Sequence, residues 1–230
     1  MFVPVMSRRG EIAAGIQASL AAGLGLYPLG IALGLLVMQA GLPWWITPGL
    51  SIAAYAGSLE LLLVGLMTSI TPLPTIALTT LLVNFRHVFY AFSFPLKVVK
   101  NPLARLYSVY ALTDESYAVT AVNPTGWTAP KLLTTQFAFQ FYWVMGGLTG
   151  VLLANLISAS IKGLEFALCA LFITLTLDAA RDRSQITPLL MAGLSVAFAK
   201  IVTPNAVLFT ALLVFVILLV FRFIWERRNA

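Results

Sequence analysis

Four stretches of this chain contain no aspartate, glutamate, lysine or arginine: residues 12–59, 61–85, 132–161 and 201–221. A helix crosses the hydrocarbon core of a bilayer with about 20 apolar residues. Each stretch is therefore long enough to span, and the first could hold two spans. Core helices of soluble proteins usually carry a polar stripe, and a chain of 230 residues is too short to bury four stretches without one. The pattern predicts an integral membrane protein.

Composition supports the same class. The chain is 60% hydrophobic and only 10% charged, whereas a soluble domain carries about 25% charged residues. The net charge of +6 comes mostly from basic residues in loops and in the tail. Such a distribution is typical of membrane orientation rather than of a nucleic-acid surface. We therefore expect the lipid bilayer, and no nucleic acid, as a partner.

The spans are predicted to be helices rather than strands of a barrel. Residues 207–220 (VLFTALLVFVILLV) lack the alternation of apolar and polar side chains that a barrel strand shows over about ten positions. The predicted fold is an all-α polytopic bundle of about seven or eight transmembrane segments, forming one domain over residues 1–230. The segments are expected at 12–40, 45–67, 73–95, 104–122, 132–160, 164–178, 185–202 and 204–224.

Some of these segments are expected to be broken or short. Residues 12–40 contain Pro28 and several glycines, and transporters use interrupted helices near the middle of the membrane to hold solutes. The alternative is that the glycines allow close helix packing, which fits Gly30-x-x-x-Gly34 and Gly146-x-x-x-Gly150. The shared Ile-Thr-Pro at residues 46–48 and 186–188 would suit an internal repeat.

The distribution of charge predicts which side of the membrane the C-terminal tail faces, but it leaves the topology of the first half of the chain undecided. Arg222, Arg227 and Arg228 predict a cytoplasmic C-terminus by the positive-inside rule. If 104–122 spans the membrane, the lysines and the arginine near its start fall outside. If it does not span, Arg8 and Arg9 fall on the wrong side unless the first segment is broken and forms a short hairpin. Both topologies stay open at this stage.

Ionisable side chains within a bilayer cost about 2.5–3.5 kcal/mol on insertion scales, so they are candidates for function. Glu60 follows Gly57 and Ser58 inside an apolar stretch. Small residues at this point let another backbone approach, and the carboxylate could bind a proton or a substrate amine. The alternative is a glutamate near a helix end that pairs with a neighbour.

Asn84, Arg86, His87 and Tyr90 form the densest polar cluster within an apolar segment. On one helix Asn84 would face His87, and Arg86 would face Tyr90. Arg86 could hold a substrate carboxylate or an internal acid. The single histidine excludes a metal site built on several imidazoles and could relay protons. Alternatively, Arg86 and His87 extend to the membrane surface from a helix end.

A third polar block lies within residues 104–122. It consists of Thr113, Asp114, Glu115, Ser116 and Tyr117. Two adjacent carboxylates in lipid need partners, and charge balance suggests that one of them pairs with Arg86. A short cytoplasmic helix, in which water solvates both acids, is the alternative.

Together these blocks resemble the AzlC family. The resemblance rests on Tyr55-Ala56-Gly57-Ser58, on Asn84-Phe85-Arg86-His87-x-x-Tyr90 and on Leu112-Thr113-Asp114-Glu115-Ser116-Tyr117. Pro28-x-Gly30 and the EFALCALFITL stretch at 165–175 are also similar. One departure is Glu60, where the family usually has glutamine.

The resemblance implies a permease of the bacterial cytoplasmic membrane that exports branched-chain amino acids or close analogues. It also implies a second, much smaller membrane subunit of the AzlD type. The residues assigned to the pathway for substrate or protons are Pro28, Gly57, Ser58, Glu60, Asn84, Arg86, His87, Tyr90, Thr113, Asp114, Glu115 and Tyr117.

We expect a secondary transporter without metal or cofactor rather than an enzyme. The chain has no phosphate-binding loop of the G-x-x-x-x-G-K-[ST] type and no H-E-x-x-H motif, so ATP would not drive it directly. An intramembrane protease would need a pair of acids such as Asp114 and Asp178. A scaffold subunit without transport activity is the remaining alternative.

Overall fold

The computed structural model describes residues 7–122, 125–156, 186–204 and 207–229, together with single positions at 166, 173, 176, 177 and 180. The chain divides into two compact units, Met1–Ala167 and Leu168–Ala230. Each unit is described by itself. Within the described ranges every regular element is a helix, which confirms the predicted all-α class.

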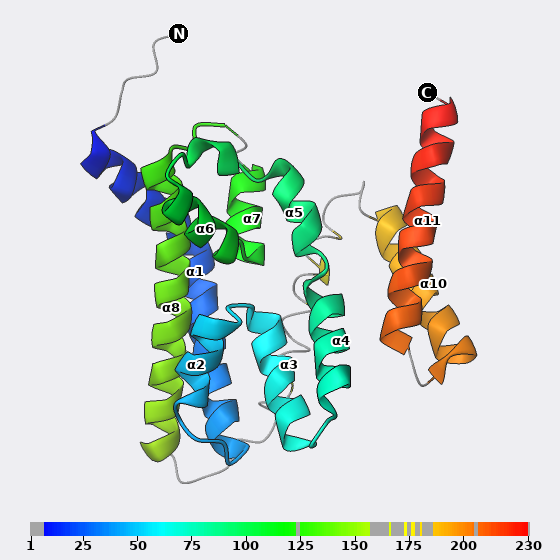
Figure 1. The fold of residues 1–230 in the computed structure, drawn as a ribbon, viewed down its shortest axis with the longest axis horizontal. Coiled ribbons are helices and arrows are strands. Elements are labelled where there is room, and N and C mark those ends of the chain that lie inside the picture. The colour runs from blue at the N-terminus through cyan, green and yellow to red at the C-terminus, as the bar shows by residue number, and fades with distance from the viewer. Residues whose placement is uncertain are drawn as a thin grey trace. The chain divides into compact units, whose positions relative to one another are not determined.

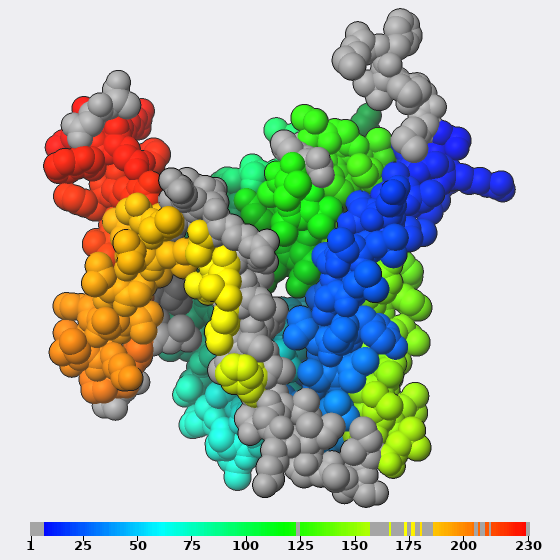
Figure 2. Space-filling model, turned by 180° about the vertical axis from the view of Figure 1, so that it is seen from behind, coloured from blue at the N-terminus to red at the C-terminus, as the bar shows by residue number. Residues whose placement is uncertain are grey.

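Two long continuous helices form the frame of the first unit. α1 (Arg8–Gln39) and α8 (Ala129–Leu156) lie side by side over most of their length (Figures 1 and 2). Gly30 packs against Gly146, and Gly34 packs against Gly150. Because residues of increasing number meet in order along both helices, α1 and α8 run parallel.

The predicted interruption near Pro28 was wrong. α1 continues through Pro28 without a break, and this proline is exposed on the outer surface of the helix. A proline is tolerated inside a membrane helix when the backbone groups that it frees find other partners. The two Gly-x-x-x-Gly motifs serve close packing, because an added Cβ on Gly30 would lie 2.7 Å from the carbonyl oxygen of Trp143.

The segment expected at 45–67 consists of two short helices, α2 (Ile46–Ala53) and α3 (Gly57–Thr68). The chain reverses at Tyr55, whose φ of 42° lies in the left-handed region that side chains other than glycine seldom adopt. The pair lies beside the C-terminal halves of α1 and α8 (Figure 1). Neither helix has the roughly 20 residues that a span requires.

The next segment crosses the unit in the opposite direction. α4 (Leu73–Asn84) and α5 (His87–Ser93) follow each other around a turn at Phe85 and Arg86. Past the end of α5, Phe94 packs in one cluster with Leu132 from the N-terminal part of α8. α4 and α5 therefore run antiparallel to α8, ending at the 3₁₀ turn η1 (Leu96–Val98).

A second pair of short helices occupies residues 102–122. α6 (Pro102–Tyr110) and α7 (Asp114–Val122) lie beside the N-terminal halves of α1 and α8 (Figure 1). Ala104 near the start of α6 and Val119 near the end of α7 pack on the same cluster as Ala129. The pair therefore enters and leaves at one end of the unit, so 104–122 is a hairpin rather than a span.

A glutamine of α8 supports the break between α6 and α7. The Gln136 amide nitrogen donates to the carbonyl oxygens of Ser108 at 2.8 Å and of Ala111 at 3.0 Å. Its amide oxygen accepts from the Ser108 hydroxyl at 2.7 Å, and Gln136 itself is fully buried. Irregular backbone at membrane depth requires such partners, because lipid offers none.

Three stretches in the described part of the chain are long and apolar enough to cross a membrane: Arg8–Gln39, Leu73–Ser93 and Ala129–Leu156. The total of seven or eight segments stays a prediction, and most of the segment expected at 164–178 lies outside the described residues.

In the second unit, α10 (Ile186–Val202) and α11 (Val207–Asn229) pack against each other. The Thr203 and Thr210 hydroxyls, 2.7 Å apart, join them. α2 and α10 both begin at Ile-Thr-Pro, but α2 ends after 8 residues and α10 after 17. The internal repeat and the single domain stay predictions.

Candidate functional site

An ion pair joins the polar blocks from three different segments. The Arg86 Nη2 atom lies 2.7 Å from Asp114 Oδ2 and donates to the Ser58 hydroxyl at 2.8 Å. Arg86 is at the turn between α4 and α5, Asp114 begins α7, and Ser58 is in the first turn of α3. The expected pairing of one acid with Arg86 is present, and Asp114 is the acid that makes it.

Two stacked tyrosines lie next to the ion pair. The Tyr90 hydroxyl donates to Asp114 Oδ1 at 2.8 Å, so both carboxylate oxygens are engaged. The ring of Tyr90 stacks on that of Tyr117 at a centroid distance of 4.2 Å. Arg86 and Tyr90 therefore meet through Asp114, because the turn at Arg86 interrupts the helix on which they were expected to face each other.

Asn84 and His87 flank the same turn. The His87 Nδ1 atom lies 3.0 Å from the backbone oxygen of Asn84, and its ring packs edge-on against Tyr90. The Oδ1 atom of Asn84 and the Nε atom of Arg86 are buried without a hydrogen-bond partner within the described ranges. An acceptor and a donor at this turn thus keep unused hydrogen-bonding capacity.

Glu60 occupies a separate and fully buried position. Its Oε2 atom accepts from the Ser51 hydroxyl at 2.8 Å and from the Trp143 indole at 3.0 Å. Its Oε1 atom accepts from the backbone N–H of Ala56 at 3.0 Å. These bonds link α2, α3 and α8 around the break at Tyr55. Within the described residues, no hydrogen bond or ion pair joins Glu60 to Arg86 or Asp114.

The tips of the two hairpins meet beside Trp143. The Tyr110 hydroxyl at the end of α6 donates to the carbonyl oxygen of Ile52 in α2 at 2.6 Å. The Tyr110 ring lies 5.5 Å from that of Tyr55, measured between centroids. Tyr110 is in turn held from α8, because Gln140 donates to its hydroxyl at 2.9 Å.

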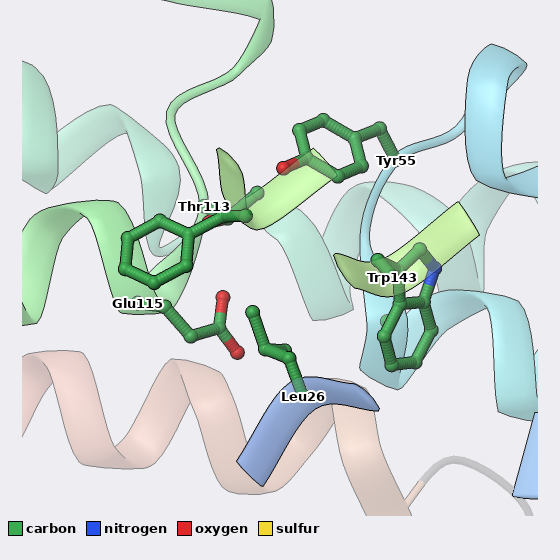
Figure 3. A pocket seen from close by; sticks show the side chains of 7 residues that line it. Leu26, Tyr55, Thr113, Glu115 and Trp143 are labelled. Atoms are coloured by element: carbon green, nitrogen blue, oxygen red, sulfur yellow. The ribbon is translucent and has the colours of Figure 1, made fainter. Parts of the chain in front are cut away.

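A small cavity of about 20 Å³, enough for little more than a water molecule, lies at this junction. Its wall is formed by Leu26, Tyr55, Gly57, Thr113, Glu115, Phe139 and Trp143. The Glu115 carboxylate extends from α7 toward Leu26, with Trp143 beyond it (Figure 3). Gly57 must lack a side chain, because an added Cβ would lie 2.9 Å from the Trp143 ring.

Sequence reasoning found Gly57, Thr113 and Glu115 but missed the aromatic and aliphatic wall. Tyr55 stood in a block singled out for its family resemblance, yet it was not assigned to the site. Leu26, Phe139 and Trp143 lie in uncharged runs, where nothing distinguishes a cavity wall from ordinary core. Pro28 was assigned to the site, but it is exposed and does not line the cavity.

The interior of this unit carries more acid than base. In residues 12–96 and 106–130, the arginine Arg86 is accompanied by three carboxylates, those of Glu60, Asp114 and Glu115. Asp114 pairs with Arg86. No lysine, arginine or histidine of the described residues forms an ion pair with Glu60 or Glu115. In the same residues, no cluster of histidine, cysteine and acids could hold a metal ion.

Comparison with known proteins identifies the family. The family model described as AzlC protein matches residues 21–157, which is more than half of the chain and contains every residue of the ion pair and the cavity. The chain belongs to the AzlC family. The resemblance carried by the three polar blocks is thereby confirmed.

Relatives in this family include membrane proteins from several bacteria. An uncharacterized membrane protein of Helicobacter pylori strain J99 is 32% identical over 164 residues, 67% of this chain and 69% of that protein. The branched-chain amino acid transport protein AzlC of Bacillus subtilis strain 168 is 27% identical over 220 residues, 90% of this chain and 85% of that protein. No solved structure matches the chain.

Proposed function

We propose that this chain is a secondary transporter that exports or exchanges branched-chain or related small amino acids across the bacterial cytoplasmic membrane. The observation that carries the proposal is the convergence of three polar blocks at helix breaks inside an otherwise apolar unit. Broken helices that expose polar groups at membrane depth are typical of transporter binding sites. The name of the Bacillus subtilis relative supplies the solute class.

Arg86 is the residue that we assign to the solute carboxylate. Its Nη2 atom is engaged by Ser58 and Asp114, but its Nε atom has no partner among the described residues. Its side chain is 31% exposed and that of Asp114 is 25% exposed, so a solute could reach the pair. Gly57, Asn84, His87, Tyr90, Thr113, Glu115 and Tyr117 surround this pathway.

The distribution of charge supports an orientation. Six basic residues lie toward the end where α1 and α8 begin: Arg8, Arg9, Lys97, Lys100, Arg105 and Lys131. Of the described residues at the opposite end, the loops 40–45 and 69–72 contain no ionisable residue. By the positive-inside rule the basic end faces the cytoplasm. Two hairpins that return to the side they enter from support this orientation, because Lys97, Lys100 and Arg105 would then lie on the same side as Arg8 and Arg9.

The proposal also includes the source of energy for transport and a partner subunit. Transport would be driven by the proton gradient or by exchange, because the chain lacks a phosphate-binding loop. A small membrane subunit of the AzlD type would complete the transporter, as the family resemblance implies. We also propose that the C-terminal arginines of α11 face the cytoplasm.

Flux of radiolabelled leucine into proteoliposomes tests the proposal, with and without a co-expressed small membrane subunit. Arg86→Ala and Asp114→Asn should each abolish most of the flux while leaving folded protein. Arg222→Ala is the control, because Arg222 forms an exposed ion pair with Glu226 and should retain wild-type flux. Wild-type flux in all three variants would favour a scaffold subunit, and product formation in detergent without a gradient would favour an enzyme.

A further inference from the structure

We propose that the cavity at the junction of the two hairpins binds one internal water molecule, which the hydroxyl of Tyr55 and the carboxylate of Glu115 hold between hairpin α2–α3 and hairpin α6–α7. The cavity measures about 20 Å³. A water molecule needs about 10–15 Å³ on the same measure, so the cavity takes one water and excludes a solute. The proposal goes beyond the transport function and does not depend on it.

The hydroxyl of Tyr55 is the observation that points to a ligand. The Tyr55 side chain is only 6% exposed, and its hydroxyl has no hydrogen-bond partner in the described part of the chain. The hydroxyl points toward Thr113, which lies across the cavity (Figure 3). Because buried polar groups nearly always have a partner, either from the protein or from ordered water, this hydroxyl calls for one of the size that the cavity admits.

The opposite wall supplies the further polar groups that a buried water requires. Thr113 and Glu115 line the same cavity at the start of α7. The Glu115 carboxylate accepts from the Thr113 side chain and from its own backbone, but a carboxylate has about four acceptor positions. A water molecule can therefore accept from the Tyr55 hydroxyl and donate to Glu115, which meets the minimum of about two hydrogen bonds for a buried water.

The polar groups also distinguish this cavity from an empty packing defect. Leu26, Phe139 and Trp143 close it from α1 and α8. Cavities that stay dry have a wall of apolar side chains alone. Here a hydroxyl without a partner and a carboxylate share the wall with the apolar groups, so hydration of the cavity is favoured.

A water at this position would add to two contacts that already join the hairpins. The Tyr110 hydroxyl donates to the carbonyl oxygen of Ile52 at 2.6 Å, and the Tyr110 ring lies beside that of Tyr55. The φ of 42° at Tyr55 is a strained conformation, which persists only where the surroundings hold it. A water bound to the Tyr55 hydroxyl would tie the break between α2 and α3 to the start of α7.

The effect of Tyr55→Phe on stability has opposite signs for a hydrated and a dry cavity. With a bound water the variant loses a hydrogen bond, and the Tm in detergent should fall by about 2–4 °C. With a dry cavity the variant removes a hydroxyl that has no partner, so the Tm would stay the same or rise, which would overturn the proposal.

Thr47→Val is the control for this variant. The Thr47 hydroxyl is also buried without a partner in the described residues, but Thr47 is not part of the wall of this cavity. Its replacement should not lower the Tm, because no bound water loses a partner.

Hydroxyl-radical labelling detects the water without any variant. X-ray radiolysis of the full-length chain in lipid nanodiscs generates radicals from bound water as well as from bulk water. Phe139 is fully buried in the cavity wall, whereas Phe94 is 6% exposed and lies in an apolar cluster outside the cavity. A bound water should oxidise Phe139 faster than Phe94, and slower oxidation of Phe139 would contradict the proposal.

A bare sodium ion is the other occupant of this size, because Glu115 carries a carboxylate. Measuring the Tm in sodium chloride and in choline chloride separates the two, and equal values are expected for a water. A higher Tm in sodium chloride that is lost in Tyr55→Phe would overturn the proposal in favour of a cation site. None of these measurements involves leucine flux, so their failure would leave the transport proposal standing.

Discussion

Besides α4 and α5, the first unit contains two kinds of helix, and the two kinds have different roles. α1 and α8 are continuous, lie in contact along glycines, and have no aspartate, glutamate, lysine, arginine or histidine in their central parts. The two hairpins, α2–α3 and α6–α7, consist of helices of 8 to 12 residues and carry Glu60, Asp114 and Glu115. The long pair provides a stiff frame, and the short pairs bring polar groups into it.

This comparison shows that a high glycine content does not predict where a helix is broken. α1 contains several glycines and Pro28 yet is unbroken, because its glycines are used to bring α8 close. The breaks lie instead at Tyr55, at Phe85–Arg86 and at Ala111–Thr113, next to the polar blocks. Polar side chains at a break can bind freed backbone groups, as Glu60 binds the backbone N–H of Ala56, so polar residues and breaks occur together.

The largest effect is expected from a side chain placed between the two frame helices. A Cβ at Gly34 would lie 2.8 Å from the backbone nitrogen of Val151 and closer still to the carbonyl oxygen of Gly147. Gly34→Leu should therefore leave little folded protein, measured as the monodisperse fraction in size-exclusion chromatography. Gly25→Leu is the control on the same helix, because an added Cβ at Gly25 meets no atom within 4 Å. Equal losses in both variants would contradict the role of the frame.

The next effect concerns the ion pair that joins Asp114 of the α6–α7 hairpin to Arg86 at the turn between α4 and α5. Arg86→Ala leaves Asp114 without its cation and should reduce leucine flux about 100-fold, because a hydrogen bond to a charged group contributes about 1.5–3 kcal/mol. Arg222→Ala removes an ion pair of the same 2.7 Å length from an exposed helix surface, where such pairs contribute about 0.2–1 kcal/mol. The measurement is initial flux per folded protein. A comparable loss in both variants would show that the interior position of the pair does not matter.

The sequence was sufficient for the class of fold and for the polar groups that meet. Uncharged runs predicted helices in a membrane, and charge balance predicted that an acid of the third block pairs with Arg86, which the ion pair with Asp114 confirms. Both inferences depend on the cost of charge in lipid, which is a property of the residue itself and can be derived without knowing the tertiary contacts.

The geometry at the breaks could not be derived in the same way. Residues 45–67 and 104–122 have the composition of spans, and only the reversals at Tyr55 and at Ala111–Thr113 make them hairpins. Each reversal is stabilised by a distant side chain, Trp143 for the first and Gln136 for the second. A contact over 28 to 83 positions leaves no local pattern, which is also why the wall of the cavity was missed.

A smaller effect should follow from removing the support of the second break. Gln136→Leu leaves the carbonyl oxygens of Ser108 and Ala111 without this donor, and a buried group without a partner costs about 1–3 kcal/mol. We expect the protein to lose about 2–3 kcal/mol of stability in denaturant titrations followed by circular dichroism. Gln17→Leu, at an exposed position of α1, should cost nothing measurable. An unchanged stability of Gln136→Leu would mean that the break between α6 and α7 does not depend on α8.

The smallest expected effect on stability comes from removing a single hydroxyl, either that of Thr47 in a hairpin or that of Thr135 in a frame helix. The Thr47 hydroxyl in α2 is buried without a partner in the described residues. The Thr135 hydroxyl in α8 donates to the carbonyl oxygens of Gly15 at 3.0 Å and of Lys131 at 2.9 Å. Replacing a buried hydroxyl that has no partner with a methyl group removes a desolvation cost, so Thr47→Val should be neutral or stabilise by up to about 1 kcal/mol.

Thr135→Val has the opposite expectation, because it removes a bond between the two frame helices. Hydrogen bonds between membrane helices contribute about 0.6 kcal/mol on average and at most about 1.7 kcal/mol, so a loss within this range is expected. Thermal unfolding of both variants in the same detergent measures the difference directly. If Thr47→Val destabilised the protein more than Thr135→Val, the Thr47 hydroxyl would have to bind a group when the protein is in a membrane. The hairpin would then be as tightly held as the frame.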